Sequence, residues 1–229
     1  MPKEDLENRI LLGITGEKED WKSKLEDINR LGITGAALFL ERFDQTQRKK
    51  IYRALLDSPL KEIPLCHIRN DMEIEEVVFL ESKFKTKYFT IHEAGFSFLD
   101  KWPGFENKLY LEMNVDNYVS DKVVVERIGG FCVDFSHFFA AAQKMTKDFE
   151  YVYYKKGKIN FACNHISGYD EQNNSDFHTI KDIKSFDYLK EIPEFLFGKI
   201  MALEVDNSIP EQIKFKNYLI ALLGKSSNN

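Results

Sequence analysis

Short apolar segments recur along the chain, and between them apolar residues return every three or four positions. The segments are rich in β-branched and aromatic residues and are shorter than ordinary helices, so we expect each one to be a buried strand. The spacing between them is typical of helices that lay one apolar face on a sheet. The expected strands are residues 10–14, 33–40, 63–68, 87–92, 109–112, 131–134, 159–165 and 200–205.

Helices are expected between most of these strands, and capping signals support several of them. Gly32 ends the first of these helices, Asp44 has the side chain of an N-cap, and Pro210 lies in the first turn of the last helix. The connection 93–107 contains Trp-Pro-Gly and little helical period, so we expect a helix to be shortened or lost there. The expected helices are residues 17–31, 45–56, 72–84, 121–128, 137–143, 183–197 and 209–223.

The alternation of eight strands with helices over 229 residues predicts one α/β domain, a single (β/α)8 TIM barrel formed by residues 1–224. We expect the barrel to be compact, with one or more shortened βα connections. Residues 151–154 suit either a strand or the end of a helix, residues 167–178 suit a polar loop, and residues 225–229 suit a disordered tail. An open, doubly wound sheet is the competing architecture, but no Gly-x-Gly-x-x-Gly sequence follows the first strand.

The composition fits a globular protein in a reducing compartment. A net charge of −5 argues against a broad nucleic-acid-binding face, although a local basic rim is compatible with it. Cys66, Cys132 and Cys163 each fall in an expected strand, so we interpret them as reduced core residues. No apolar run approaches the about 20 residues of a membrane span, and the N-terminus lacks a signal-peptide core. We therefore expect a cytoplasmic protein without a membrane partner.

Imidazole and carboxylate side chains follow the carboxyl ends of the last six expected strands. Strand ends in a parallel barrel converge on one mouth, where such folds place their chemistry. A single histidine at a strand end is more often a hydrogen-bonded residue than a ligand, but the ordered set is harder to explain in that way. Nine such groups exceed the needs of one zinc or manganese ion, and they predict a multinuclear site. They are His67, His92, Glu112, Asp134, His137, His165, Asp176, His178 and Glu204.

This ordered set resembles the endonuclease IV type of apurinic/apyrimidinic endonuclease, within the wider xylose-isomerase-like TIM-barrel superfamily. Residues 132–141, Cys-Val-Asp-Phe-Ser-His-Phe-Phe-Ala-Ala, are similar to the family's Asp-x-x-His sequence with its trailing alanines. Residues 176–178, Asp-Phe-His, are similar to its Asp-x-His sequence. The resemblance spans essentially the whole chain, and its specificity lies in the order of the ligands.

The resemblance implies a phosphodiester hydrolase with up to three zinc ions, for which manganese is an alternative. Carried over residue by residue, His67, His92 and Glu112 would hold one ion, Glu112, Asp134, His165 and Glu204 a second, and His137, Asp176 and His178 a third. A metal-bound hydroxide would cleave DNA at an abasic site, while the other ions neutralise charge on the phosphoryl oxygens and the leaving group. Glu112, Asp134 and Glu204 are the residues expected at the reacting centre.

Departures from the family pattern bear on the DNA substrate. The family's Pro-Gly after the second histidine and its Asn-Asp after the fourth are replaced by residues 93–95 and 167–168. The connections that grip DNA in the family are trimmed here, and residues 69–71 offer no aromatic wedge for a base stack. Arg42 and Phe43 are expected to serve in part as that wedge. DNA is thus one candidate partner, and a phosphorylated or sugar small molecule is the other.

Two other functions are compatible with the sequence. A sugar or sugar-phosphate isomerase or epimerase of the same superfamily resembles the chain at only four positions, Glu112, Asp134, His165 and Glu204. Such an enzyme holds one ion while a glutamate pair moves protons beside a carbonyl, so the number of ligands favours the hydrolase. A metal-binding barrel without catalysis is the other alternative, and the complete set of ligand residue types argues against it.

Overall fold

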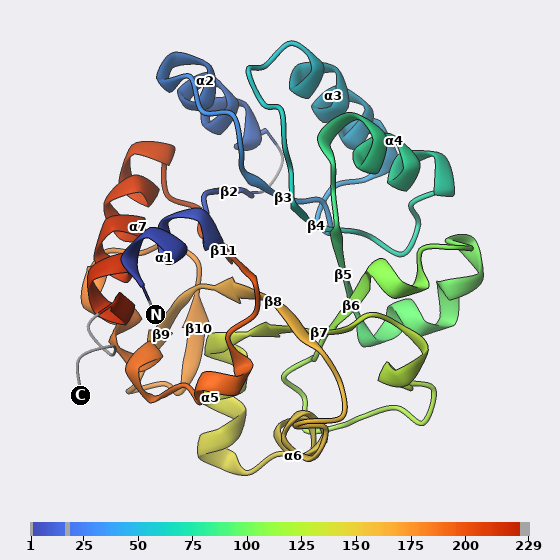
Figure 1. The fold of residues 1–229 in the computed structure, drawn as a ribbon, viewed down its shortest axis with the longest axis vertical. Coiled ribbons are helices and arrows are strands. Elements are labelled where there is room, and N and C mark those ends of the chain that lie inside the picture. The colour runs from blue at the N-terminus through green and yellow to red at the C-terminus, as the bar shows by residue number, and fades with distance from the viewer. Residues whose placement is uncertain (1, 17–18, 225–229) are drawn as a thin grey trace.

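Parallel strands form a single sheet that curls into a nearly closed barrel in the computed structural model, which describes residues 2–16 and 19–224 (Figure 1). Within these residues the barrel has nine strands, in the order β1-β11-β8-β7-β6-β5-β4-β3-β2. Their bounds are β1 Ile10–Leu11, β2 Gly13–Ile14, β3 Ala37–Phe39, β4 Leu65–His67, β5 Tyr88–His92, β6 Leu109–Glu112, β7 Gly130–Asp134, β8 Phe161–Ile166 and β11 Ile200–Leu203. The expected α/β class is confirmed, and the sheet is consistent with a TIM-like barrel.

The barrel closes where the start of the chain meets its last strand. β1 pairs with β11 and β2 pairs with β3, all in parallel, and only Leu12 separates β1 from β2. At this seam the side chain of Gln212 accepts a hydrogen bond from Gly13 N at 2.7 Å and donates one to Gly13 O at 3.0 Å. A side-chain amide therefore supplies hydrogen bonds where β2 and β11 are not paired with each other.

Helices surround the barrel, and α2, α3 and α4 lie along the side formed by the early strands (Figure 1). The α-helices are α1 Lys3–Arg9, α2 Trp21–Leu31, α3 Gln45–Leu56, α4 Ile74–Phe84, α5 Phe135–Lys144, α6 Lys147–Tyr154 and α7 Ile209–Leu223. The 3-10 helices are η1 Glu93–Lys101, η2 Glu106–Lys108, η3 Val125–Arg127, η4 Ile183–Glu191 and η5 Glu194–Leu196. Asp44 caps α3 in a capping box, and Gly32 ends α2 in the left-handed conformation, as expected.

Some expected elements are wrong. Residues 121–128 contain only the 3-10 turn η3 and no α-helix. Residues 183–197 form the two 3-10 helices η4 and η5, which are separated at Pro193. The polar loop 167–178 contains a two-stranded antiparallel hairpin, β9 Gly168–Asp170 with β10 Ser175–Phe177. Residues 151–154 belong to α6, and the expected tail 225–229 lies outside the described residues.

Apolar residues fill both faces of the barrel wall. A cluster outside the sheet joins it to the helices through residues such as Ile28, Ile51 and Val77. A smaller, separate cluster contains Ala37, Phe39, Leu65, Tyr110, Cys132, Ala162, Cys163 and Ala202. Because inward positions on a strand are two residues apart, this smaller cluster lies directly beneath the polar side chains at the strand ends.

The three cysteines Cys66, Cys132 and Cys163 are buried and form no disulfide, as expected for core residues. Across the described ranges, we find no helix with both the length and the apolar character needed to cross a bilayer.

Candidate metal centre

The expected ligands gather at the carboxyl ends of the barrel strands. His67, His92, Glu112 and Asp134 are the last residues of β4, β5, β6 and β7. In the sheet register His92 lies beside Glu112 and Asp134 lies beside His165 of β8, so neighbouring strands end at the same height. Two positions earlier, three of these strands have inward-facing residues of the apolar cluster, namely Leu65, Tyr110 and Cys132, and β5 has the buried Thr90. Strand alternation therefore points these ligands into the barrel mouth.

Glu112 is the centre of the cluster. Its Oε2 atom lies 3.0 Å from His165 Nδ1 and 3.4 Å from His67 Nδ1, and its Oε1 atom lies 3.7 Å from His137 Nδ1. His165 Nδ1 is also 3.1 Å from Glu204 Oε2. Neighbouring ligands of a tetrahedral zinc ion with bonds of 2.0–2.1 Å lie about 3.3 Å apart. Most of these separations are compatible with ligands that share an ion, as well as with direct pairing of imidazole and carboxylate.

Three groups of side chains within the described ranges have ligand atoms that all lie within 4.8 Å of one another. They are His67, His92 and Glu112; then Glu112, Asp134, His165 and Glu204; and then His67, His165 and Glu204. The first two groups are the first and second ion sites implied by the sequence resemblance. The third group joins residues of both sites, so the two sites lie close together.

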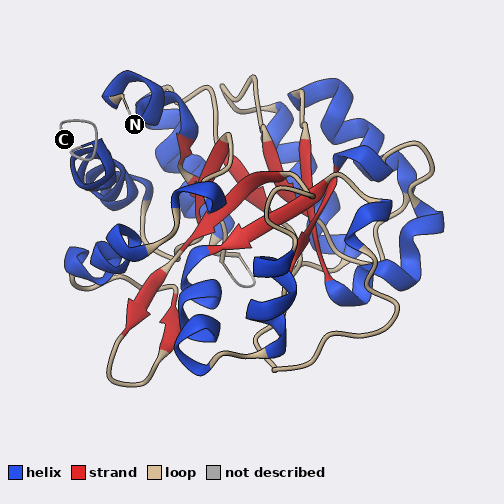
Figure 2. Cartoon of the chain, turned by 60° about the horizontal axis from the view of Figure 1, so that its bottom comes forward, coloured by secondary structure: helices blue, strands red, loops and turns tan. Residues whose placement is uncertain are grey.

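The third expected ion site is assembled more loosely. His137 Nε2 and His178 Nε2 lie 3.5 Å and 3.2 Å from the same oxygen, Asp176 Oδ2. His137, Asp176 and His178 do not form a group within 4.8 Å by the criterion above. The hairpin β9–β10, which appears as two short strands at the lower left of Figure 2, carries Asp176 to the barrel mouth. His178 is fixed beside it, because its Nδ1 atom lies 2.8 Å from the carbonyl oxygen of Glu204.

Hydrogen bonds orient Asp134 and leave one of its oxygens for a ligand. Asp134 Oδ1 accepts hydrogen bonds from Ser136 Oγ at 2.6 Å and from the backbone N–H of His137 at 2.9 Å. The second bond makes Asp134 the N-cap of α5. Ser136 Oγ also lies 2.6 Å from Ser167 Oγ. Asp134 Oδ2 is buried and has no hydrogen-bond partner among the described residues. Such secondary contacts are typical of metal ligands.

Buried polar atoms without hydrogen-bond partners concentrate at this mouth. Within residues 2–16 and 19–224, they include one or more atoms of Glu41, His67, His92, Glu112, Asp134, His137, His165 and Glu204. Glu112 and His165 are 2% and 0% exposed, and a buried carboxylate is unfavourable unless a positive group neutralises it. The residues present therefore fit one or more divalent cations.

The protonation states of the cluster follow from burial and from mutual charge. Burial lowers the pKa of His67 to about 3, so its imidazole is neutral, as a metal ligand must be. Burial opposes ionisation of Glu112, but His165, His92 and His67 hold the pKa of its carboxyl well below the ordinary value. Burial likewise opposes protonation of His165, but Glu112 and Glu204 raise its pKa well above the ordinary value. A cation bound there would displace that proton.

Sequence reasoning missed one member of this cluster, Glu41. It follows β3 and places Oε2 at 3.8 Å from His67 Nδ1. Burial and the nearby carboxylate of Glu204 raise the pKa of Glu41 to about 8. The available signal was its position directly after the apolar run 36–40, the same context that singles out Glu112 and Glu204.

The suggestion that Arg42 and Phe43 serve as a wedge in DNA is wrong for the aromatic residue. Phe43 is 1% exposed and packs in the core, so its ring is not available to enter a base stack. Arg42 has an exposed side chain and lies 3.6 Å from Glu41. Of the two residues, only Arg42 is therefore available for a contact with DNA.

Comparison with protein-family models gives no match for the sequence, and comparison with curated proteins gives none either.

Proposed function

We propose that the chain is a metal-dependent phosphodiester hydrolase of the endonuclease IV type, which cleaves DNA at abasic sites. The observation that carries the proposal is the sharing of Glu112 between two ligand groups, with His137 beside it and Asp176 and His178 beyond. This number of converging imidazoles and carboxylates exceeds the needs of one ion. It is suited to a reaction in which several positive charges surround one phosphate.

The proposal includes a complete (β/α)8 barrel. β1 and β2 would be two halves of one first strand, interrupted at Leu12, so that the nine strands occupy eight positions. In support, Leu12 O accepts a hydrogen bond from Ala37 N at 2.8 Å, which continues the pairing of β2 with β3. The resemblance to the xylose-isomerase-like superfamily requires this count.

The roles of the residues follow from their positions. The first ion would be held by His67, His92 and Glu112, the second by Glu112, Asp134, His165 and Glu204, and the third by His137, Asp176 and His178. Zinc, or manganese in its place, would supply positive charge to the phosphoryl oxygens and lower the pKa of water when bound. Glu112 would keep the first two sites adjacent, while Ser136 and the start of α5 hold Asp134 in place.

We propose DNA as the substrate, bound through a small basic area on the protein surface. The side chain of Arg69, two residues beyond His67, is 42% exposed and pairs with Asp71 at 3.3 Å, and its guanidinium would suit a phosphate contact at the rim. We further propose a cytoplasmic location, which is supported by three buried cysteines that remain free.

A sugar or sugar-phosphate isomerase is the second candidate, and one observation favours it. The four residues that it would share with this chain, Glu112, Asp134, His165 and Glu204, form the largest group of mutually close ligands in the described chain. The third ion site is less tightly assembled. A single ion in that group would suit proton movement beside a carbonyl.

Metal content and incision, measured together, test the proposal. Protein purified without chelator would be analysed for bound metals and incubated with a duplex containing one abasic site and with an intact duplex. We expect close to three ions per chain and incision of the abasic duplex only. His178→Ala is expected to bind about one ion fewer and to lose about 10- to 100-fold in metal affinity or activity. Glu171→Gln, an exposed change on the same hairpin, is the matched control.

The alternatives give different results in the same experiment. One ion per chain, no incision and turnover of an aldose or ketose phosphate would replace the hydrolase with the isomerase. Bound metal without turnover of any of these substrates would indicate a non-catalytic barrel. Equal metal content in His178→Ala and Glu171→Gln would remove the third ion site from the proposal.

A further inference from the structure

Glu41 continues the alternation that places the other ligands in the barrel mouth. Ala37 and Phe39 belong to the apolar cluster inside the barrel, whereas Leu38 and Leu40 belong to the outer core. Glu41 is the next inward position after Phe39. In the same way His67 follows Leu65 and Glu112 follows Tyr110, with the lower residue in the inner cluster each time. β3 therefore presents a carboxylate where its neighbours present ligands.

The backbone fixes this carboxylate beside His67. Leu40 N donates a hydrogen bond to His67 O at 2.8 Å, which extends the pairing of β3 with β4 by one residue. A tight turn follows, because Phe43 N bonds to Leu40 O at 3.0 Å, and the buried ring of Phe43 anchors the turn. Glu41 lies within this turn, so its Cα position is set by backbone bonds on both sides.

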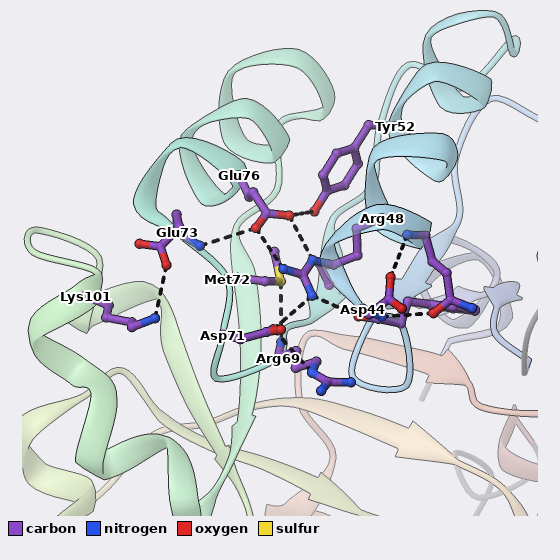
Figure 3. A network of polar contacts seen from close by, with 12 residues as sticks. Asp44, Arg48, Tyr52, Arg69, Asp71, Met72, Glu73, Glu76 and Lys101 are labelled. Carbon is purple, nitrogen blue, oxygen red and sulfur yellow. Dashed lines mark hydrogen bonds and ion pairs between the residues drawn. The ribbon is translucent and has the colours of Figure 1, made fainter.

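A buried arginine supports the same turn from behind (Figure 3). Arg48 of α3 is fully buried and donates from Nη1 to Phe43 O at 2.8 Å. Its Nε and Nη2 atoms donate to the two carboxylate oxygens of Glu76 at 2.8 Å and 2.9 Å, and its Nη1 also donates to Asp71 at 2.9 Å. Arg48 thereby ties the turn after β3 to the segment after β4, and a bidentate pair of this kind holds a fixed geometry.

The free oxygen of Glu41 faces the metal centre. Oε2 is buried, has no hydrogen-bond partner among the described residues and lies 3.8 Å from His67 Nδ1. Both ring nitrogens of His67 also lack hydrogen-bond partners within that part of the chain. The separation is somewhat longer than the about 3.3 Å between neighbouring ligands of one ion. Glu41 is not in a group within 4.8 Å with His92 and Glu112, so its side chain, which has three rotatable bonds, would rotate to reach an ion held by them.

We propose that Glu41 is a tenth residue of the metal centre, which gives a carboxylate oxygen to the ion held by His67. This inference rests on the metal centre of the proposed function but is independent of the reaction catalysed there. With Glu41, the first site has two imidazoles and two carboxylates. Added oxygen ligands suit manganese and other ions of higher coordination number better than tetrahedral zinc.

Metal titration of Glu41→Gln tests the assignment. The metal-free chain would be titrated with Mn²⁺ and with Zn²⁺ against a competing chelator, and its unfolding temperature would be measured with and without each ion. Glu41→Gln is expected to weaken Mn²⁺ binding at one site by about 10- to 100-fold, the range found for residues that support metal ligands. Loss of Zn²⁺ affinity is expected to be smaller. The unfolding temperature of the metal-free variant is expected to stay close to that of the unaltered chain, since glutamine has nearly the same size and Glu41 Oε2 makes no hydrogen bond to the described residues.

Arg42→Gln tests whether the effect of Glu41→Gln comes from a lost metal ligand or from a lost ion pair. Arg42 is the cationic neighbour of Glu41, at 3.6 Å. Arg42→Gln is expected to weaken metal binding much less than Glu41→Gln does, because it leaves the carboxylate of Glu41 in place. Equal affinities in Glu41→Gln and the unaltered chain would overturn the assignment, as would an equal loss in Arg42→Gln. Failure of the unaltered chain to cleave abasic DNA would contradict the hydrolase alone, whereas failure to bind any metal would overturn both proposals.

Discussion

A buried lysine lies beside the barrel mouth, outside the ligand cluster. Lys24 of α2 is 2% exposed, and its ammonium donates to Val205 O at 2.8 Å and lies 3.5 Å from Thr15 Oγ1. Burial lowers the pKa of Lys24 to about 8, while the carboxylates of Asp206 and Asp20 partly oppose this shift. The cation thus connects the end of β2 to the segment after β11, where the barrel closes.

The lowered pKa of Lys24 makes stability depend on pH in a defined direction. Between about pH 8 and the ordinary lysine value near 10.4, the unfolded chain binds a proton that the folded chain does not. The contribution of Lys24 to the free energy of unfolding therefore rises with pH in this window, by up to ~1.4 kcal/mol per unit. Denaturant unfolding of the unaltered chain and of Lys24→Met would measure it as a difference that changes between pH 8 and 10.

Lys22→Met is the control for this effect, since Lys22 lies on the same helix with an exposed side chain. It is expected to shift stability equally at both pH values. A constant difference between Lys24→Met and the unaltered chain would show that the ammonium of Lys24 does not titrate in this window.

The sequence predicted which side chains lie at the barrel mouth where the residue ends an apolar segment. The six strand-end ligands fall at the mouth because parallel strands converge there, and this follows from alternation alone. Glu41 was missed because the second strand carries no histidine to draw attention to its end. The burial of Phe43 also escaped prediction, because the tight turn that folds its ring into the core depends on the buried cation of Arg48.

At the level of elements, the seam between β2 and β11 depends on one side chain of α7. Gln212 is fully buried and bonds to Gly13 N, Gly13 O and Asn207 O. A Cβ atom on Gly13 would lie 1.9 Å from Leu203 O, so the two strands approach each other too closely for any residue but glycine. The amide of Gln212 satisfies the backbone groups that this close approach leaves without strand partners.

Gln212→Ala is expected to lower the free energy of unfolding by about 3 kcal/mol, because it leaves buried backbone groups without hydrogen bonds. Urea denaturation would measure this change. Gln143→Ala, at an exposed position of α5, is the matched control and is expected to change stability by less than about 0.5 kcal/mol. A similar small effect for both variants would mean that water replaces the amide at the seam.

Strand positions followed from the sequence more closely than the connections did. Buried strands have a distinct apolar composition, whereas α1 buries a single residue, Leu6, and so has no pattern to detect. The expected helix 121–128 contains three consecutive valines, which are stiff at χ1 and favour helices weakly. In the structure Val123 and Val125 are buried while Val124 is exposed, an alternation that does not suit a helix.

For the whole molecule, the barrel wall is uneven. The strands β2, β3 and β4 are followed by the α-helices α2, α3 and α4, whereas β5 and β6 are followed by the 3-10 segments η1, η2 and η3 (Figure 1). Around η3, turn bonds such as Val123 N to Ser120 O at 2.9 Å are joined by two longer-range bonds, in which Tyr151 OH accepts from Val125 N at 3.3 Å and donates to Val123 O at 3.2 Å. Val115 and Tyr118, earlier in the same connection, are 49% and 59% exposed.

Local opening should therefore begin at residues 113–122, since most of these residues are exposed, and a segment with few buried contacts has low local stability. Amide hydrogen exchange would show these backbone protons exchanging well before those of α4 or β7, and earlier exchange of α4 would contradict this. The segment follows Glu112 directly, so each such opening would expose the carboxylate shared by two ligand groups. The uneven wall would therefore make this side of the barrel mouth more mobile than the side that α2, α3 and α4 cover.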